Sequence, residues 1–169
     1  MKSIWLLCLA LIVSPTWAQT GPVSNPSVQD FVNALKPAST TRGLGRNLTV
    51  EPARVERAPR IDITVGFDFD SYRIQADSKP TLQNLATAMK SDDLSSLRFR
   101  IEGHTDAKGN ARYNDTLSAR RARSVLEFLT DQGVPGDRVS SIGKGASEPL
   151  VAEDVYSAKN RRVRVSVVD

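Results

Sequence analysis

The chain has 169 residues, a length that suits one domain with appended segments. The hydrophobic fraction of 40% and the charged fraction of 25% are those of an ordinary globular protein and not of a disordered chain. A net charge of +4 would suit a nucleic-acid partner, but Lys and Arg are spread along the chain and aromatic residues make up only 6%. We therefore predict no nucleic-acid partner.

The first 18 residues are typical of a targeting segment that is removed on export. The run at 4–13 is apolar but too short to span a membrane, and small residues before position 19 predict cleavage after Ala18. Cys8 is the only cysteine and would leave with this segment. The mature chain is therefore predicted to contain no disulfide and no thiolate metal ligand.

Residues 19–59 differ in composition from the rest, because prolines and small polar residues interrupt them repeatedly. Most of this stretch is expected to be an extended linker. The exception is 27–35, where apolar side chains recur at helical spacing behind a serine cap. These residues are Ser27, Val28, Phe31, Val32 and Leu35. Two interpretations stay open: a short helix that docks on its own domain, and a helix that binds a partner.

Residues 60–169 are expected to form the compact domain. Alternation of apolar and polar residues predicts four strands, at 61–69, 97–102, 139–142 and 162–167. Helical spacing predicts two helices, one at 76–90 and a longer one between Gly109 and Gly133.

The alternation of strands with helices indicates βαβ units, and the alternation within each strand indicates a sheet with one wet face. The last strand follows the third too closely for another crossover helix, which favours a mixed sheet. We predict an α/β two-layer sandwich of order β-α-β-α-β-β, with both helices packed on one face of a mixed sheet.

The longer helix carries polar residues inside its apolar face, namely Asn114, Ser118 and Arg121. An arginine on a burial-prone face needs an acceptor, because an unpaired buried charge is strongly unfavourable. The nearest acid in sequence is Asp106, in the turn before the helix. An acid and a base are therefore expected to share one pocket.

Several motifs in this order resemble the OmpA-like peptidoglycan-binding domain, which also occurs in peptidoglycan-associated lipoproteins and flagellar-motor stator proteins. They are Phe67-Asp68-Phe69-Asp70-Ser71, Gly103-His104-Thr105-Asp106, Asn114-Asp115-Thr116-Leu117-Ser118, Gly133-Val134-Pro135 and Asn160-Arg161-Arg162-Val163. The resemblance covers about residues 60–168 and leaves 19–60 uncovered.

The resemblance implies non-covalent binding of peptidoglycan through the diaminopimelate of its stem peptide, by a periplasmic protein that tethers an envelope protein or complex to the cell wall. Association with the outer membrane stays open. The implied site places the ligand ammonium on Asp106 and its carboxylate on Arg121, which offers two parallel hydrogen bonds. The other implied residues are Asn114, the backbone of Thr105, Leu117 beneath the ligand, and Asp68 and Arg161 along the pocket. An alternative is an interaction module in which 19–59 recruits an envelope partner and wall binding is secondary.

Structural interpretations of the same residues stay open beside the functional one. Asp106 and Arg121 could form an ion pair with no ligand, and Asn114 and Ser118 could be satisfied by the preceding loop. His104, the only histidine, fits a satisfied residue at a strand end better than a catalytic base. The arginines of the strands, Arg98, Arg100 and Arg164, are expected to solvate the open sheet face or to touch an anionic glycan or lipid.

An enzyme is the rival from another class. A single histidine and no mature cysteine exclude a multi-histidine or thiolate zinc site and a cysteine nucleophile. The chain has no Gly-x-Ser-x-Gly elbow and no Walker loop, and Tyr72 and Arg73 occupy the ligand and glycine positions of a would-be calcium loop. We predict a protein that is not an enzyme and holds no metal or cofactor. Glycosidase chemistry by two carboxylates stays open, since any two acids can meet in space.

Overall fold

The computed structural model describes residues 21–37 and 58–168. The targeting segment, its cleavage site and residues 38–57 of the expected linker lie outside the described residues. The helices are α1 (Val28–Leu35), α2 (Lys79–Lys90) and α3 (Ala111–Asp131). The strands are β1 (Arg60–Ile63), β2 (Arg98–Gly103), β3 (Val139–Gly143) and β4 (Val163–Val168). Short 3₁₀ turns occupy Ala76–Ser78, Gly136–Arg138 and Ala158–Asn160.

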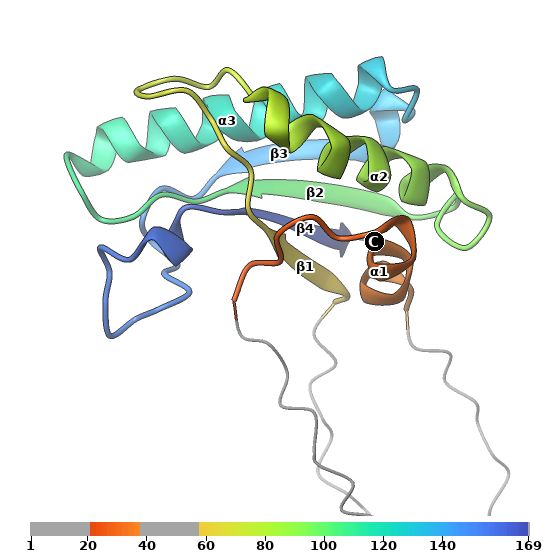
Figure 1. Ribbon diagram of the computed structural model, residues 1–169, viewed down its shortest axis with the longest axis horizontal. Coiled ribbons are helices and arrows are strands. Elements are labelled where there is room, and N and C mark those ends of the chain that lie inside the picture. The colour runs from red at the N-terminus through yellow and green to blue at the C-terminus, as the bar shows by residue number, and fades with distance from the viewer. Residues whose placement is uncertain (1–20, 38–57, 169) are drawn as a thin grey trace, which may run out of the picture.

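The four strands form one mixed sheet in the order β1-β4-β2-β3, and α2 and α3 cover one of its faces (Figure 1). β4 runs antiparallel to both β1 and β2, whereas β2 and β3 are parallel. Helix α3 connects the two parallel strands, β2 and β3, and the last strand, β4, lies between β1 and β2. The predicted two-layer α/β sandwich with a mixed sheet is confirmed.

The core lies between this sheet and the helices. The register pairs Ile101 with Val165 and Gly103 with Val163, so the apolar residues of neighbouring strands share the helix-facing side. Phe99, Ile101 and Val165 are fully buried there. Gly103 permits the close approach of α3, because a side-chain carbon at this position would overlap the carbonyl oxygen of Ser118. The first half of α3 is thereby held against the end of β2.

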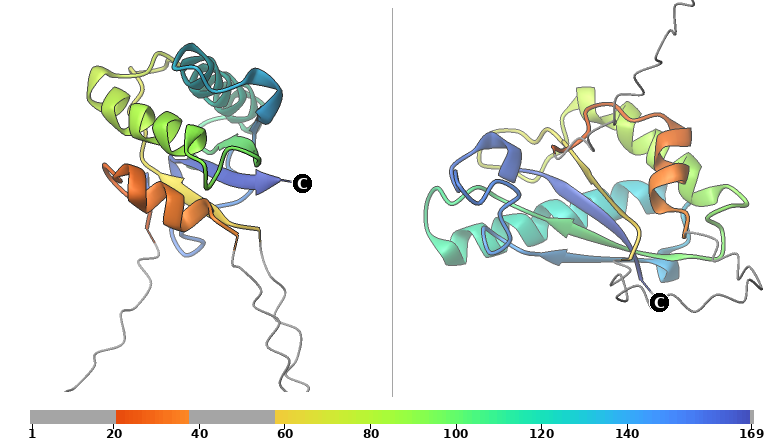
Figure 2. Two further views of the ribbon diagram at one scale, coloured as in Figure 1. Left: turned by 90° about the vertical axis from the view of Figure 1, so that its right-hand side faces the viewer. Right: turned by 90° about the horizontal axis from the view of Figure 1, so that it is seen from below.

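Residues 21–37 pack onto this domain instead of standing apart from it. Helix α1 begins with a capping box between Ser27 and Asp30, and lies beside α2 at the β1 edge of the sheet (Figure 2). Phe31 and Leu35 are fully buried in the common core, and Val23 forms a parallel bridge to Ile63. The apolar face of α1 is therefore occupied by its own domain, and the folded unit extends beyond the expected boundary at residue 60.

The first strand is shorter than the alternation at 61–69 predicts. Pairing with β4 ends at Ile63, and Phe67 forms only an isolated bridge with Ile74. The chain then reverses at Asp70, whose φ of 51° is left-handed, and Phe69 is fully exposed. The alternation continues through this stretch, but the tight turn leaves no partner strand beside it.

Candidate functional site

The candidate site lies where β2 ends and β4 begins. Gly103 is the last residue of β2 and pairs with Val163, the first residue of antiparallel β4. Residues that follow β2 and residues that precede β4 therefore emerge at the same edge of the sheet. This geometry brings Asp106 and Arg161 together although 55 residues separate them.

Asp106 is 7% exposed, and both of its carboxylate oxygens are used. Oδ2 lies 2.7 Å from Nη1 of Arg161, and Oδ1 accepts a hydrogen bond of 3.1 Å from the backbone N–H of Lys108. The predicted alternative of an ion pair between Asp106 and Arg121 is wrong, because Arg161 occupies the carboxylate. Sequence periodicity could not indicate this partner, since the contact depends on strand pairing.

Arg121 lies close to this pair but bonds elsewhere. Its Nε donates to the carbonyl oxygen of Ser71 at 2.9 Å, and its guanidinium lies over the ring of Phe67, 4.8 Å from the ring centre. Burial lowers the pKa of Arg121, and the positive charge of Arg161 lowers it further, while Asp70 and Asp106 oppose these effects. The two guanidinium groups are thus close enough for their charges to repel one another.

Asn114 and Ser118 on α3 are buried and bonded to neighbouring backbone. The Asn114 amide donates to the carbonyl oxygens of Lys108 at 2.9 Å and Asp106 at 3.3 Å. The Ser118 hydroxyl donates to the Asp115 carbonyl and accepts from the N–H of Gly145. The preceding loop therefore satisfies Asn114 as expected, and Asn114 holds the turn that presents Asp106. Ser118 is satisfied by its own helix and by Gly145 instead of by that loop.

Three further predicted residues surround this centre in different ways. The backbone N–H of Thr105 donates to the Gly145 carbonyl at 2.9 Å, so this N–H is used within the protein. A role of the Thr105 backbone in holding a ligand stays a prediction. Leu117 is half-buried one helical turn before Arg121. Asp68 is half-exposed and its only ion-pair contact among the described residues is with Arg73, at 3.9 Å. It belongs to the loop that supplies the Ser71 carbonyl, and is not brought onto Asp106.

A small cavity of about 20 Å³ lies behind the two arginines. Arg121, Arg161, Phe67 and His104 are among its lining residues. This volume is near that needed for one water molecule and is far smaller than an amino acid. An amino acid does not fit inside this cavity as it stands, and the side chain of Arg161, one of its lining residues, is 48% exposed.

Asn160 is a residue of this region that the sequence patterns did not single out beyond its place in a motif. Its side chain is fully buried, and its oxygen accepts from the backbone N–H groups of Leu150 and Val151 at 2.8 and 2.9 Å. Its amide donates to the Asp154 carbonyl at 2.9 Å. Asn160 therefore fixes the loop from which Arg161 projects.

A second group of charges lies on the sheet face opposite the helices. Arg162, which is buried, and Arg164, which is half-buried, both donate to Asp62, at 3.0 and 2.9 Å. Burial acts to raise the pKa of Asp62, but the hydrogen bond from Arg164 and the charge of Arg162 outweigh it and hold this pKa below its usual value. Arg164 is thus part of an ion-pair network, whereas the sequence led us to expect a solvated side chain.

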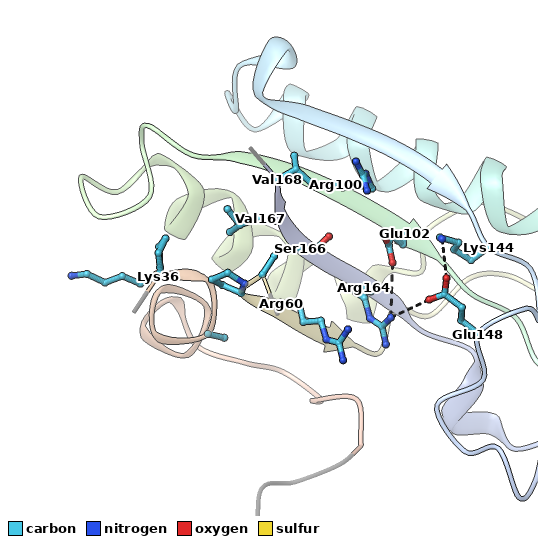
Figure 3. A pocket seen from close by; sticks show the side chains of 14 residues that line it. Lys36, Arg60, Arg100, Glu102, Lys144, Glu148, Arg164, Ser166, Val167 and Val168 are labelled. Atoms are coloured by element: carbon cyan, nitrogen blue, oxygen red, sulfur yellow. Dashed lines mark hydrogen bonds and ion pairs between the residues drawn. The ribbon is translucent and has the colours of Figure 1, made fainter. Parts of the chain in front are cut away.

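This sheet face also forms a wide hollow of about 1000 Å³ (Figure 3). Arg164 lies between Glu102 and Glu148 on its floor, and Lys144 pairs with Glu148 at 2.8 Å. The charges of Arg164, Lys144, Glu102 and Glu148 are paired with one another, whereas Arg60 and Arg100, which also line the hollow, add positive charge to it.

Residues 21–37 and 58–168 contain no cluster of His, Cys, Asp and Glu suited to a metal ion. Within the same residues, no helix has the length and apolar character needed to cross a membrane.

The model of the OmpA family matches residues 66–163 of the chain. Outer membrane porin F of Pseudomonas aeruginosa is 40% identical over 128 residues, in a match that covers 72% of this chain and 36% of the porin. The peptidoglycan-associated lipoprotein of Rhizobium meliloti is 32% identical over 127 residues, covering 75% of this chain and 71% of the lipoprotein. The chain spans about a third of the length of the porin F relatives that it matches.

Solved structures agree with these matches. The peptidoglycan-associated lipoprotein of Burkholderia pseudomallei is 32% identical and superposes with a TM-score of 0.51, over 62% of this chain and 86% of that one. The periplasmic domain of Helicobacter pylori MotB has the same fold, with a TM-score of 0.57 at 19% identity, over 68% of this chain and 78% of that one.

Proposed function

Because the chain belongs to the OmpA family, we propose that it binds peptidoglycan non-covalently, through the diaminopimelate of the stem peptide, and so tethers an envelope protein or complex to the cell wall. Relatives that are named peptidoglycan-associated lipoproteins support the ligand class. Membership of this family assigns the chain to binding modules and not to enzymes.

The observation that carries the proposal is the pair of guanidinium groups, Arg121 and Arg161, beside the single carboxylate of Asp106. The free end of diaminopimelate is a zwitterion, with an ammonium and a carboxylate on one carbon. A carboxylate between the two arginines would relieve their mutual repulsion and accept charge-assisted hydrogen bonds from them. The ammonium would take the place that Arg161 now holds on Asp106.

The remaining residues act in support of these three. Asn114 holds the turn of Asp106, and Thr105 anchors the same turn through Gly145. Leu117 offers an apolar surface beside Arg121 for the aliphatic chain of the ligand. Asp68 pairs with Arg73 and with none of these three, and we propose for it only a contribution to the negative charge around the site.

The proposed location is the periplasm. Relatives that are named as outer membrane proteins or as peptidoglycan-associated lipoproteins support a place in the cell envelope. Removal of residues 1–18 as a signal peptide on export is part of this proposal. Recruitment of an envelope partner by residues 19–59 is the alternative, and it would have to use surfaces other than the buried face of α1 that contains Phe31, Val32 and Leu35.

Co-sedimentation of the mature protein with purified sacculi tests the proposal. Walls that contain diaminopimelate should pellet the protein, and walls that contain lysine in its place should pellet much less of it. Asp106→Ala and Arg121→Ala, checked for folding by circular dichroism, should both abolish the difference. Equal pelleting with both walls that is unchanged in the variants and removed by salt would identify nonspecific attraction and refute the site.

A further inference from the structure

A second groove, of about 680 Å³, lies along the first half of α3 next to the proposed diaminopimelate site. One wall is the helix itself, and the other is the loop before α2, which passes over the helix (Figure 1). Asp70 and Tyr72 come from the loop, and Arg112, Tyr113 and Arg120 come from the helix. Of its lining residues, only Leu117 has a role in the function proposed above.

The groove exposes two aromatic rings in a chain that has few of them. Tyr72 is 51% exposed and Tyr113 is 46% exposed. The Tyr113 hydroxyl donates to Asp70, and the guanidinium of Arg120 lies 5.9 Å from the ring centre of Tyr72. Both rings are therefore held in place by polar neighbours while part of their surface stays open to solvent.

The groove is continuous with the proposed site. Tyr113, Leu117 and Arg121 follow one another at four-residue spacing and thus form one row along α3. Eight residues of helix cover about 12 Å, so a ligand held at Arg121 would cross Leu117 and reach Tyr113 within this distance. Leu117 lines the groove and also belongs to the proposed diaminopimelate site.

The polar groups of the groove are of both signs. Asp70 supplies an acceptor, and Arg112 and Arg120 supply donors that form no ion pair within the residues that the structure describes. Flat aromatic surface with donors and acceptors at its margin matches a pyranose ring, whose C–H groups pack on aromatic faces while its hydroxyl and amide groups form hydrogen bonds. The carboxylate of Asp70 in the wall means that the groove is not uniformly positive.

We propose that this groove binds an N-acetylated amino sugar of the glycan strand to which the stem peptide is attached. The inference rests on the proposed function, because the peptide would lead from the site at Arg121 to a sugar held between Tyr72 and Tyr113. The domain would then contact both components of the wall polymer, the peptide through its charges and the glycan through these rings.

Two soluble fragments test the proposal by calorimetric titration of the mature protein: a disaccharide that carries the diaminopimelate tripeptide, and the same tripeptide without sugars. Wild type should bind the sugar-bearing fragment about tenfold more tightly. Tyr113→Ala and Tyr72→Ala should remove this advantage and leave the affinity for the free tripeptide unchanged. Tyr113→Phe keeps the ring and should keep most of the advantage, and Ile142→Ala, an exposed apolar residue of β3, should change nothing.

Equal affinity of wild type for both fragments would overturn the glycan site, and Asp106-dependent binding of the tripeptide in the same experiment would leave the proposed function standing. Equal weakening of both fragments by Tyr113→Ala would also overturn it, since the ring would then serve the peptide or the fold.

A measurement without the peptide separates the two proposals further. A tetramer of N-acetylglucosamine should shift the NMR signals of Tyr72, Tyr113 and Thr116 at millimolar concentration, in wild type and in Asp106→Ala alike. No shift at these residues would overturn the glycan site, whatever the diaminopimelate experiments show.

Discussion

Asp106 and Arg161 are joined by a 2.7 Å contact between Oδ2 and Nη1, across the edge where β2 ends and β4 begins. Arg121, which lies on helix α3, donates to the carbonyl oxygen of Ser71 instead. The acid is therefore paired with one arginine, while the other is bonded to a backbone carbonyl. We expect the ligand to exchange these contacts and not simply to fill a space.

Arg161 and its neighbour Arg162 should differ sharply in their contribution to stability. Arg161 is half-exposed, so Arg161→Ala should change the free energy of unfolding by less than about 1 kcal/mol while it weakens wall binding. Arg162 is buried and bonded to Asp62, so Arg162→Ala should lower the free energy of unfolding by about 3 kcal/mol. Urea denaturation of both variants measures this difference. A larger loss for Arg161→Ala would make its pair with Asp106 a structural element.

Asn160 should act on binding through the loop that carries Arg161. Asn160→Ala removes the acceptor of two backbone N–H groups, and should lower stability by about 2 kcal/mol and also weaken wall binding. Asn160→Asp keeps that acceptor and should recover part of the binding. Retention of full binding by a folded Asn160→Ala protein would show that the loop does not position Arg161.

The free energy of unfolding should decrease as the pH falls from about 6.5 to about 4, because of His104. Its side chain is buried without a hydrogen-bond partner among the described residues, and burial, followed by the charges of Arg162 and Arg164, lowers its pKa to about 4. The unfolded chain binds the proton near pH 6.5, before the folded one does, so the free energy of unfolding is highest above pH 6.5 and decreases as the pH falls towards 4. The total loss should be about 3 kcal/mol.

His104→Gln, which has no group that titrates in this range, should flatten the decrease between pH 6.5 and 4. Loss of the Asp62 interactions should begin only at lower pH, because the pKa of this carboxyl is held below its usual value and its stabilising effect persists until the pH approaches that value. Urea denaturation at intervals of half a pH unit measures both effects. An equal slope in wild type and His104→Gln would show that His104 is not the group responsible.

The close packing of α3 on β2 predicts a strong effect of adding one carbon at Gly103. Gly103→Ala would force the new side chain against the backbone of Ser118 and should lower the free energy of unfolding by about 1–3 kcal/mol. Gly136→Ala is the matched control, since its nearest neighbour would be 3.8 Å away at Thr130. Thermal unfolding of the two variants checks the prediction, and equal melting temperatures would contradict the packing described here.

Local patterns were sufficient for most of the fold. The spacing of apolar residues located α2, α3 and the last strand, because helical and strand periods are properties of neighbouring residues. The same alternation predicted a first strand that is too long, because it gives no information on the turn at Asp70 or on the lack of a partner strand beside Phe69. Edge and centre positions in a sheet follow from tertiary pairing.

The residues of the candidate site were predictable from the sequence, but the contacts between them were not. The residues around Asp106 and Arg121 were found through a polar stripe on a helix and a family resemblance, and the structure brings them to one region. The partner of Asp106 was not predictable from a local period, because Arg161 arrives by the pairing of β2 with β4. The use of the Thr105 N–H by Gly145 depends on the same long-range packing.

The most direct test of the account is calorimetric titration of the mature protein with two soluble tripeptides that differ only in their third residue, diaminopimelate or lysine. Lysine lacks the second carboxylate, so the end of its side chain offers an ammonium but no carboxylate for Arg121 and Arg161 to share. The account predicts binding of the diaminopimelate peptide alone, lost in Asp106→Ala and in Arg121→Ala. Equal affinity for the two peptides would contradict the proposed zwitterion site.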